Sequence, residues 1–162
     1  MRGSVLVCSL VMACGGGGGG GNDGGGDPDG PPSPACVEAT TYQDITNIES
    51  EIFVKSCTFS GCHNGGNTDA GMTDLRAGAA HAHLVGVASK VDTTRTLVVA
   101  GNPAASYLLL MIGQVSPGEA DPPGSAPPAN IGLMPQSAGG VLLCKEKRDA
   151  IERWITAGAP SD

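Results

Sequence analysis

The stretch Cys57-Thr58-Phe59-Ser60-Gly61-Cys62-His63 decides which fold is expected, because it places two thiols and an imidazole close together in the chain. A cysteine followed directly by a histidine is the pattern by which c-type haem is attached. The two thiols form thioethers with the haem vinyl groups, and the adjacent histidine coordinates the iron from one face. The motif predicts one covalent haem c, bound through Cys57 and Cys62, with His63 as the proximal iron ligand.

The spacing of the two cysteines departs from the usual haem-attachment motif. That motif has two residues between the cysteines, whereas four residues separate Cys57 from Cys62. The intervening loop has to bulge for both thiols to reach the porphyrin edge. Either both thioethers form, or only the one at Cys62.

The segments around the motif favour an all-α fold. Asp44 is a good N-cap, and isoleucines follow at helical spacing from Ile45, so a helix is expected to end near Ser56. Phe53 and Trp154 are expected to pack in the core between the first and last helices. Further helices are expected at 75–85, 105–112 and 145–157, an extended run at 96–100, and a long proline-rich loop at 115–130.

Five segments occur in the order seen in a known group of proteins. They are Ile52-Phe53 with the 57–63 motif, Leu84–Val87, Val99–Leu108, Leu133-Met134-Pro135, and Ile151–Pro160. Together they resemble small cytochrome c domains of exported bacterial proteins, including planctomycete and myxobacterial types. The resemblance implies a small helical cytochrome c-like domain around one haem, which carries single electrons between exported redox partners and is not an enzyme.

The resemblance also implies a methionine as the second iron ligand. Met134 stands in the Met-Pro position where the family places its distal ligand, and a thioether ligand favours reduced iron. His83 and His81 are the alternatives, because either would give a haem with two histidine ligands. Met72 and Met111 are weaker rivals.

The N-terminal segment predicts export. Arg2 and a short apolar run precede Val11-Met12-Ala13-Cys14, which resembles a bacterial lipobox. Residues 1–13 are expected to be a lipoprotein signal peptide, with a plain secretory signal as the alternative. Lipidated Cys14 would start a disordered Gly- and Pro-rich tether over 14–35, ahead of a domain at 36–162. Gly15 after the cysteine resembles lipoproteins that are sorted to the outer membrane. The domain would then face either the periplasm or the cell surface.

Two cysteines are left once the signal, the lipid site and the haem thiols are assigned. Cys36 and Cys144 lie in a protein expected in an oxidising compartment, so a disulfide between them is expected. The alternative is a pair of free thiols.

The charge balance restricts the partners. The chain has 9 Lys and Arg against 16 Asp and Glu, for a net charge of −7. No basic patch is present for nucleic acid. The expected partners are redox proteins with a basic docking surface and a membrane reached through the lipid anchor.

Two other functions remain open from the sequence. Cys57, Cys62 and His63, with His81 or His83, have the ligand types of a structural zinc site. Alternatively, the chain is a haem-free structural or interaction domain in which Cys57 and Cys62 form a small disulfide.

Overall fold

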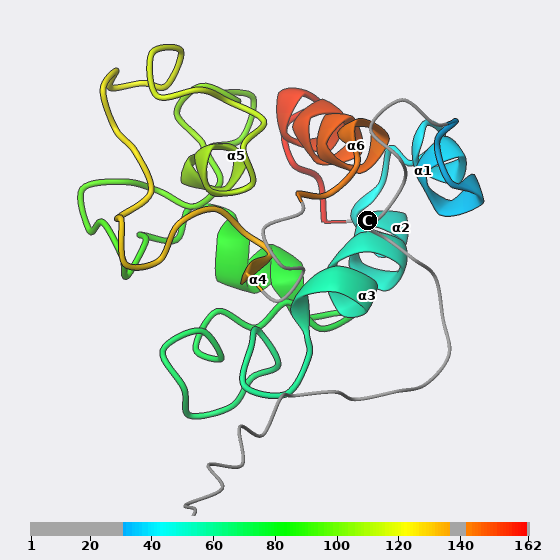
Figure 1. The fold of residues 1–162 in the computed structure, drawn as a ribbon, viewed down its shortest axis with the longest axis horizontal. Helices are drawn as coiled ribbons and strands as arrows, with labels where there is room; N and C mark the ends of the chain where they lie inside the picture. The colour runs from blue at the N-terminus through cyan, green and yellow to red at the C-terminus, as the bar shows by residue number, and fades with distance from the viewer. Residues whose placement is uncertain (1–30, 137–141, 162) are drawn as a thin grey trace, which may run out of the picture.

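The computed structural model describes residues 31–136 and 142–161, and these form a helical domain (Figure 1). The helices are α1 (Pro34–Ala39), α2 (Ile45–Ile48), the π-helix η1 (Glu49–Phe53), α3 (Val54–Cys57), α4 (Ala80–Leu84), α5 (Tyr107–Met111) and α6 (Lys145–Thr156). Extended pairing in these ranges is limited to isolated bridges. The expected signal peptide, Cys14 and the tether up to residue 30 lie outside the described residues. No helix within the described ranges has the length and apolar character needed to cross a bilayer.

The predicted first helix is present as the unbroken run α2–η1–α3. Its N-cap is confirmed, because the Asn47 backbone N–H donates to Asp44 Oδ1 at 2.8 Å. This hydrogen bond is the main cause that lowers the pKa of Asp44. The central turn is a π-helix, a feature that often lies near functional sites. The run ends at Cys57, so it delivers the first cysteine of the motif.

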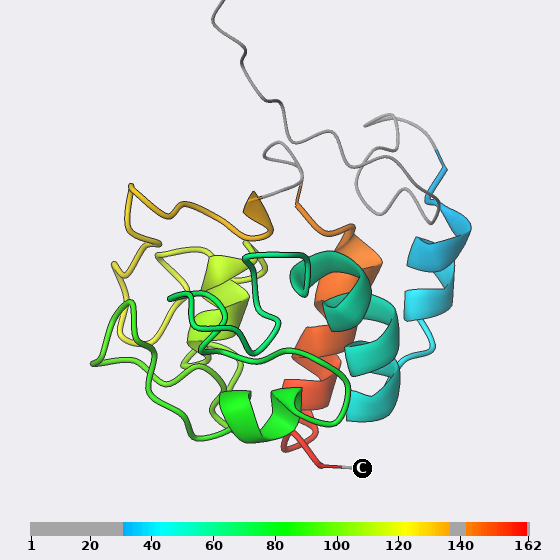
Figure 2. The ribbon, with the colours of Figure 1, turned by 90° about the horizontal axis from the view of Figure 1, so that it is seen from below.

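The predicted last helix is confirmed as α6, and its end is fixed by local hydrogen bonds. The N–H of Gly158 donates to the Ile155 carbonyl at 3.0 Å, and the N–H of Ala159 donates to the Trp154 carbonyl at 2.9 Å. This is the Schellman pattern, with Gly158 in the left-handed conformation at φ 100°. Helix α6 then lies along α1, α2 and α5, which makes it the central element of the domain (Figures 1 and 2).

The core lies between α6 and the α2–η1–α3 run. Its largest fully buried apolar members include Trp154, Phe53, Ile48, Ile52, Ile151 and Ile155. The expected burial of Phe53 and Trp154 is therefore confirmed. A smaller cluster, formed by Tyr107, Leu110, Met111 and Ala120, lies around α5. Burial of these side chains supplies most of the favourable free energy of folding.

The remaining segments are loops, and two expected helices are shorter than predicted. Helix α4 covers only Ala80–Leu84 of the expected 75–85, because Gly78 adopts φ 77° and breaks the helical path before it. Helix α5 covers Tyr107–Met111 of the expected 105–112, because Ser106 is extended and its hydroxyl donates to the Asn102 carbonyl at 2.8 Å. The predicted extended run at 96–100 contributes only isolated bridges.

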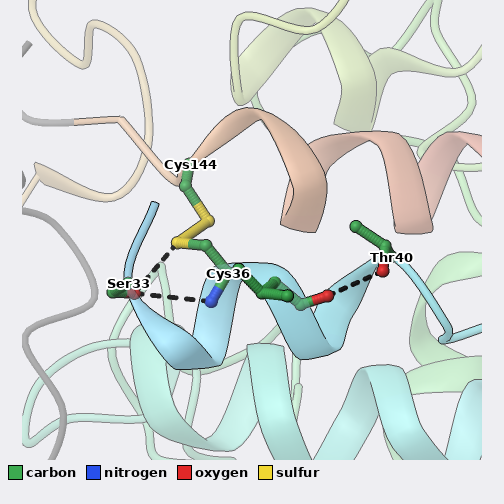
Figure 3. Close-up of a disulfide and its surroundings, with 5 residues drawn as sticks. Ser33, Cys36, Thr40 and Cys144 are labelled. Carbon is green, nitrogen blue, oxygen red and sulfur yellow. Dashed lines mark hydrogen bonds between the residues drawn. A yellow bond between two sulfur atoms is a disulfide. The ribbon is translucent and has the colours of Figure 1, made fainter. Parts of the chain in front are cut away.

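Helix α1 was not predicted from the sequence. Ser33 caps it, with its Oγ accepting from the Cys36 N–H, and Pro34 stands at the first helical position. The helix therefore begins inside the segment assigned to the tether. Cys36 and Cys144, the pair expected from the sequence, form a disulfide with a Cα–Cα distance of 6.2 Å (Figure 3). This bond joins α1 to the residue that precedes α6.

We expect the Cys36–Cys144 disulfide to be a major source of stability. It spans 108 residues, for which the chain-entropy model gives about 4–5 kcal/mol. Reduction, or the double change Cys36→Ala and Cys144→Ala, should lower the free energy of unfolding by about that amount in urea titrations. Reductant should have no further effect on the double variant. An unfolding midpoint that is the same with and without reductant in the unaltered protein would contradict this.

Candidate functional site

The 57–63 loop closes back on itself. The backbone N–H of His63 donates to the Cys57 carbonyl at 3.0 Å, and the N–H of Cys62 donates to the Phe59 carbonyl at 2.9 Å. Gly61 takes φ 81°, which a glycine adopts without strain. The two extra residues between the cysteines are thus absorbed in a compact turn, and His63 returns to the end of α3 despite the unusual spacing.

The imidazole of His63 is held in one orientation and one tautomer. Its Nδ1 lies 3.2 Å from the Thr73 carbonyl oxygen. Because a carbonyl only accepts hydrogen bonds, Nδ1 carries the proton and Nε2 keeps its lone pair. The backbone pairs the same two segments, since the Leu75 N–H donates to the His63 carbonyl at 2.9 Å. Burial lowers the pKa of His63, so the ring is favoured in its neutral, metal-binding form.

The thiol of Cys57 faces the apolar interior. Cys57 packs against the main core cluster, and burial raises the pKa of its thiol to about 12. The nearby Cys62 adds to this shift, while the charge of Lys147 opposes it. Lys147 lies on α6 and is itself buried. Both motif cysteines are free thiols in the structure.

A carboxylate–guanidinium pair fixes the segment that holds His63. The carboxylate of the buried Asp74 accepts three hydrogen bonds from Arg76. The donors are the backbone N–H at 3.0 Å, Nε at 3.0 Å and Nη2 at 2.7 Å. Gly65 lies against this pair, because a Cβ there would be 2.7 Å from Asp74 Oδ2. Since Thr73 directly precedes Asp74, the pair steadies the carbonyl that accepts from His63.

Met134 lies in the loop between α5 and α6, and its side chain packs against the interior. Its backbone N–H donates to the Met111 carbonyl at 2.8 Å, which pins the loop to the end of α5. The partly buried side chain packs against both hydrophobic clusters. Cys57 packs against the first of them, so Met134 and the first motif cysteine border the same apolar interior.

The rival ligands are occupied or placed elsewhere. Met72 is 43 % exposed, and its sulfur accepts from Lys90 Nζ at 3.2 Å. His81 donates through Nε2 to the Ala159 carbonyl at 3.0 Å, and its ring meets that of Trp154 edge-on at 6.3 Å. His81 is half-buried, and its ring packs on the last helix. His83 is exposed, and its charge contributes to the low pKa of Asp74.

The motif residues do not form a compact metal cluster in the described ranges. In those ranges, three potential ligand atoms lie within 4.8 Å of one another at Cys36, Cys144 and Glu146. The two cysteines of that group are disulfide-bonded. A structural zinc site needs ligands about 2.0–2.3 Å from one ion. Cys57, Cys62 and His63 are thus not gathered as zinc requires.

Comparison of the chain with protein-family models, curated proteins and solved structures found no match. The resemblance to small cytochrome c domains accordingly rests on the motifs of the sequence.

Two features of the site were missed by sequence reasoning. The Thr73 carbonyl is a backbone group brought to His63 by the 64–75 loop, and no residue type signals it. Lys147 belongs to a charged stretch of α6 that predicts an exposed face, yet its side chain is only 1 % exposed. A lysine three residues after Cys144 carries no sequence signal for burial beside Cys57.

Asp74 should make the stability of the fold sensitive to acid. Its pKa is lowered to about 2, mainly by the hydrogen bonds from the Arg76 side chain, whereas an unfolded aspartate has a pKa of about 3.9. The contribution of Asp74 to the free energy of unfolding is therefore complete above about pH 4, and it is lost as the pH falls through about 2. In urea titrations between those values, Asp74→Asn should show a flatter pH dependence than the unaltered protein. The exposed Asp69, changed to Asn, is the control; equal slopes for both variants would refute the assignment.

Proposed function

We propose that this chain is a monohaem c-type cytochrome, exported and lipid-anchored, that carries single electrons. The observation that carries the proposal is the closed 57–63 loop, in which His63 Nδ1–H donates to the Thr73 carbonyl, so that Nε2 is the ring nitrogen with the lone pair. Histidines that bind metal almost always donate their second ring nitrogen in this way.

The other residues of the site fit a haem better than the alternatives. A porphyrin is wide, so its two thioether positions and its iron do not require three ligand atoms in one small cluster. Cys57 and Cys62 are free, while Cys36 and Cys144 are paired in the same structure. This pattern favours thiols kept for a cofactor over a small disulfide within the motif.

Each residue then has a stated task. Cys57 and Cys62 would hold the haem by thioethers, His63 would coordinate through Nε2, and Met134 would supply a thioether sulfur on the other face. When bound, the haem supplies an iron that takes up and releases one electron. The apolar side chains that Cys57 and Met134 pack against would limit the access of water, which would raise the cost of the extra charge on oxidised iron. Because His63 and Met134 would both coordinate the iron and leave it no open position, we propose a carrier and not an enzyme.

The location and partners belong to the same proposal. Lipidation at Cys14 would tether the domain to a membrane, with residues 14–33 as the spacer ahead of α1. The net charge of −7 would favour encounter with redox proteins that present a basic surface.

The direct test is expression of the full chain in a host that has the haem c maturation machinery. The purified protein should be red, and the colour should survive acid–acetone extraction and denaturation. His63→Ala should prevent the holoprotein from accumulating, and His83→Ala, which alters an exposed histidine, should not. A colourless protein from a host that matures other c-type cytochromes would rule the proposal out.

The same material decides the number of thioethers. Cys57→Ala and Cys62→Ala should each leave one vinyl group unmodified, which shifts the alkaline pyridine spectrum of the reduced haem. The double change should abolish covalent attachment. If the spectrum of Cys57→Ala is the same as that of the unaltered protein, only Cys62 bonds to the haem.

Met134→Ala should lower the reduction potential and open the iron to carbon monoxide or cyanide. Loss of a thioether ligand removes a group that favours reduced iron. Met72→Ala is the matched control, because that methionine is exposed and its sulfur faces Lys90. Absorption spectra and redox titration report both effects. An unchanged spectrum for Met134→Ala would move the second ligand to another residue.

A further inference from the structure

The loop before α5 buries a guanidinium group. Arg95 is 3 % exposed. Its Nη1 donates to the Pro122 carbonyl at 3.1 Å and to Ser125 Oγ at 2.6 Å. Its Nε and Nη2 are also buried, and they have no hydrogen-bond partner among residues 31–136 and 142–161. Leaving buried donors of a charged group unpaired is costly.

The two unpaired nitrogens form one side of the guanidinium. Nε–H and Nη2–H point the same way, which is the fork that binds both oxygens of a carboxylate. Arg76 shows this geometry within the same chain, since its Nε and Nη2 donate to the carboxylate of Asp74. The corresponding fork of Arg95 is set up for the same kind of acceptor.

A buried tyrosine packs on the same guanidinium and also has an unpaired hydroxyl. The guanidinium carbon of Arg95 lies 5.5 Å from the ring centroid of Tyr107, a cation–π arrangement. Tyr107 is 1 % exposed, and its hydroxyl has no partner among the described residues. Buried tyrosine hydroxyls usually find an acceptor. Two buried side chains in a cation–π arrangement thus have three donors without an acceptor among the described residues.

The acidic group that interacts electrostatically with this pair has other hydrogen-bond partners. Asp92 influences the titration of Tyr107, and Arg95 influences that of Asp92. The Asp92 carboxylate instead accepts from the backbone N–H and the hydroxyl of Thr94, at 3.1 and 2.6 Å. An additional negative group is therefore the natural counterpart of the Arg95 fork.

The position of Tyr107 indicates where that group comes from. Tyr107 belongs to the small α5 cluster, and Met134 packs against this cluster as well as against the main core. The expected distal ligand and the Arg95–Tyr107 pair therefore border one apolar region. A haem carries two carboxylates, and a haem held in part by Met134 would bring these negative groups into the part of the domain that Met134 contacts.

We infer that Arg95 and Tyr107 form a carboxylate-binding subsite that holds a propionate of the haem. This inference rests on the proposed function. Arg95 supplies the fork through Nε and Nη2, Tyr107 supplies its hydroxyl, and the Pro122 carbonyl with Ser125 fixes the other side of the guanidinium. The subsite would help to orient the haem and would neutralise one of its carboxylates.

The test uses the matured holoprotein and two readouts that do not depend on electron-transfer activity. Resonance Raman spectra report the bending vibration of the propionates, and redox titration reports the potential. Arg95→Gln should shift the propionate vibration and lower the potential, because a positive charge that would favour reduced haem is lost. Arg95→Lys keeps the charge but not the fork, so it should shift the vibration with a smaller change in potential.

Two further variants make the result decisive. Tyr107→Phe keeps the ring that stacks on Arg95 and removes only the hydroxyl, so it should also shift the vibration, and it serves if the Arg95 variants fail to fold. Lys90→Gln removes an equal charge from an exposed site and should leave the vibration unchanged. Haem-loaded Arg95 or Tyr107 variants with unaltered propionate bands would overturn the subsite alone. Absence of covalent haem in the unaltered protein would instead overturn the proposed function together with it.

Discussion

The hydrogen bond from His63 Nδ1 to the Thr73 carbonyl is the constraint on which the proposed chemistry depends. It selects the neutral tautomer in which Nε2 keeps its lone pair, and it fixes the ring against the 64–75 loop. That loop is in turn held by the Asp74–Arg76 pair and by the Leu75–His63 backbone bond. A freely rotating imidazole would lose rotamer entropy on binding iron, whereas this one is already oriented. The ring that we propose as the iron ligand is thus positioned by a backbone carbonyl, and not by a side chain.

The rest of the fold supports this arrangement through α6. This helix packs against α1, α2 and α5, and the disulfide fixes its entrance to α1. Arg153 on the same helix donates to the carbonyls of Ala39, Thr40 and Tyr42, so the segment that leads into α2 is held as well. Because α2, η1 and α3 are continuous, the position of Cys57 follows from these contacts. Packing that is remote from the motif therefore sets where the motif begins.

The elements with local signals were predictable, and those set by tertiary contacts were not. Asp44 predicted the start of the first helix, and Gly158 with Pro160 predicted the end of α6, because caps act within one turn. The Ser33-Pro34 pair was an equally local signal, but it lies in a segment whose composition predicts a tether. The π-turn and the burial of Arg95 had no such signal. Candidate ligands could be proposed from residue type and order alone, whereas the tautomer of His63 and the occupation of Met72 and His81 depend on residues far away in sequence.

The central claim is that haem is bonded to the sulfurs ahead of His63. It is tested most directly by the mass of the chain after production in a cell that matures c-type cytochromes. The account predicts an intact mass greater than that of the processed polypeptide by one haem, with the added mass retained on the proteolytic peptide that contains residues 57–63. A peptide of unmodified mass, recovered from protein made under conditions that load a known c-type cytochrome, would contradict it.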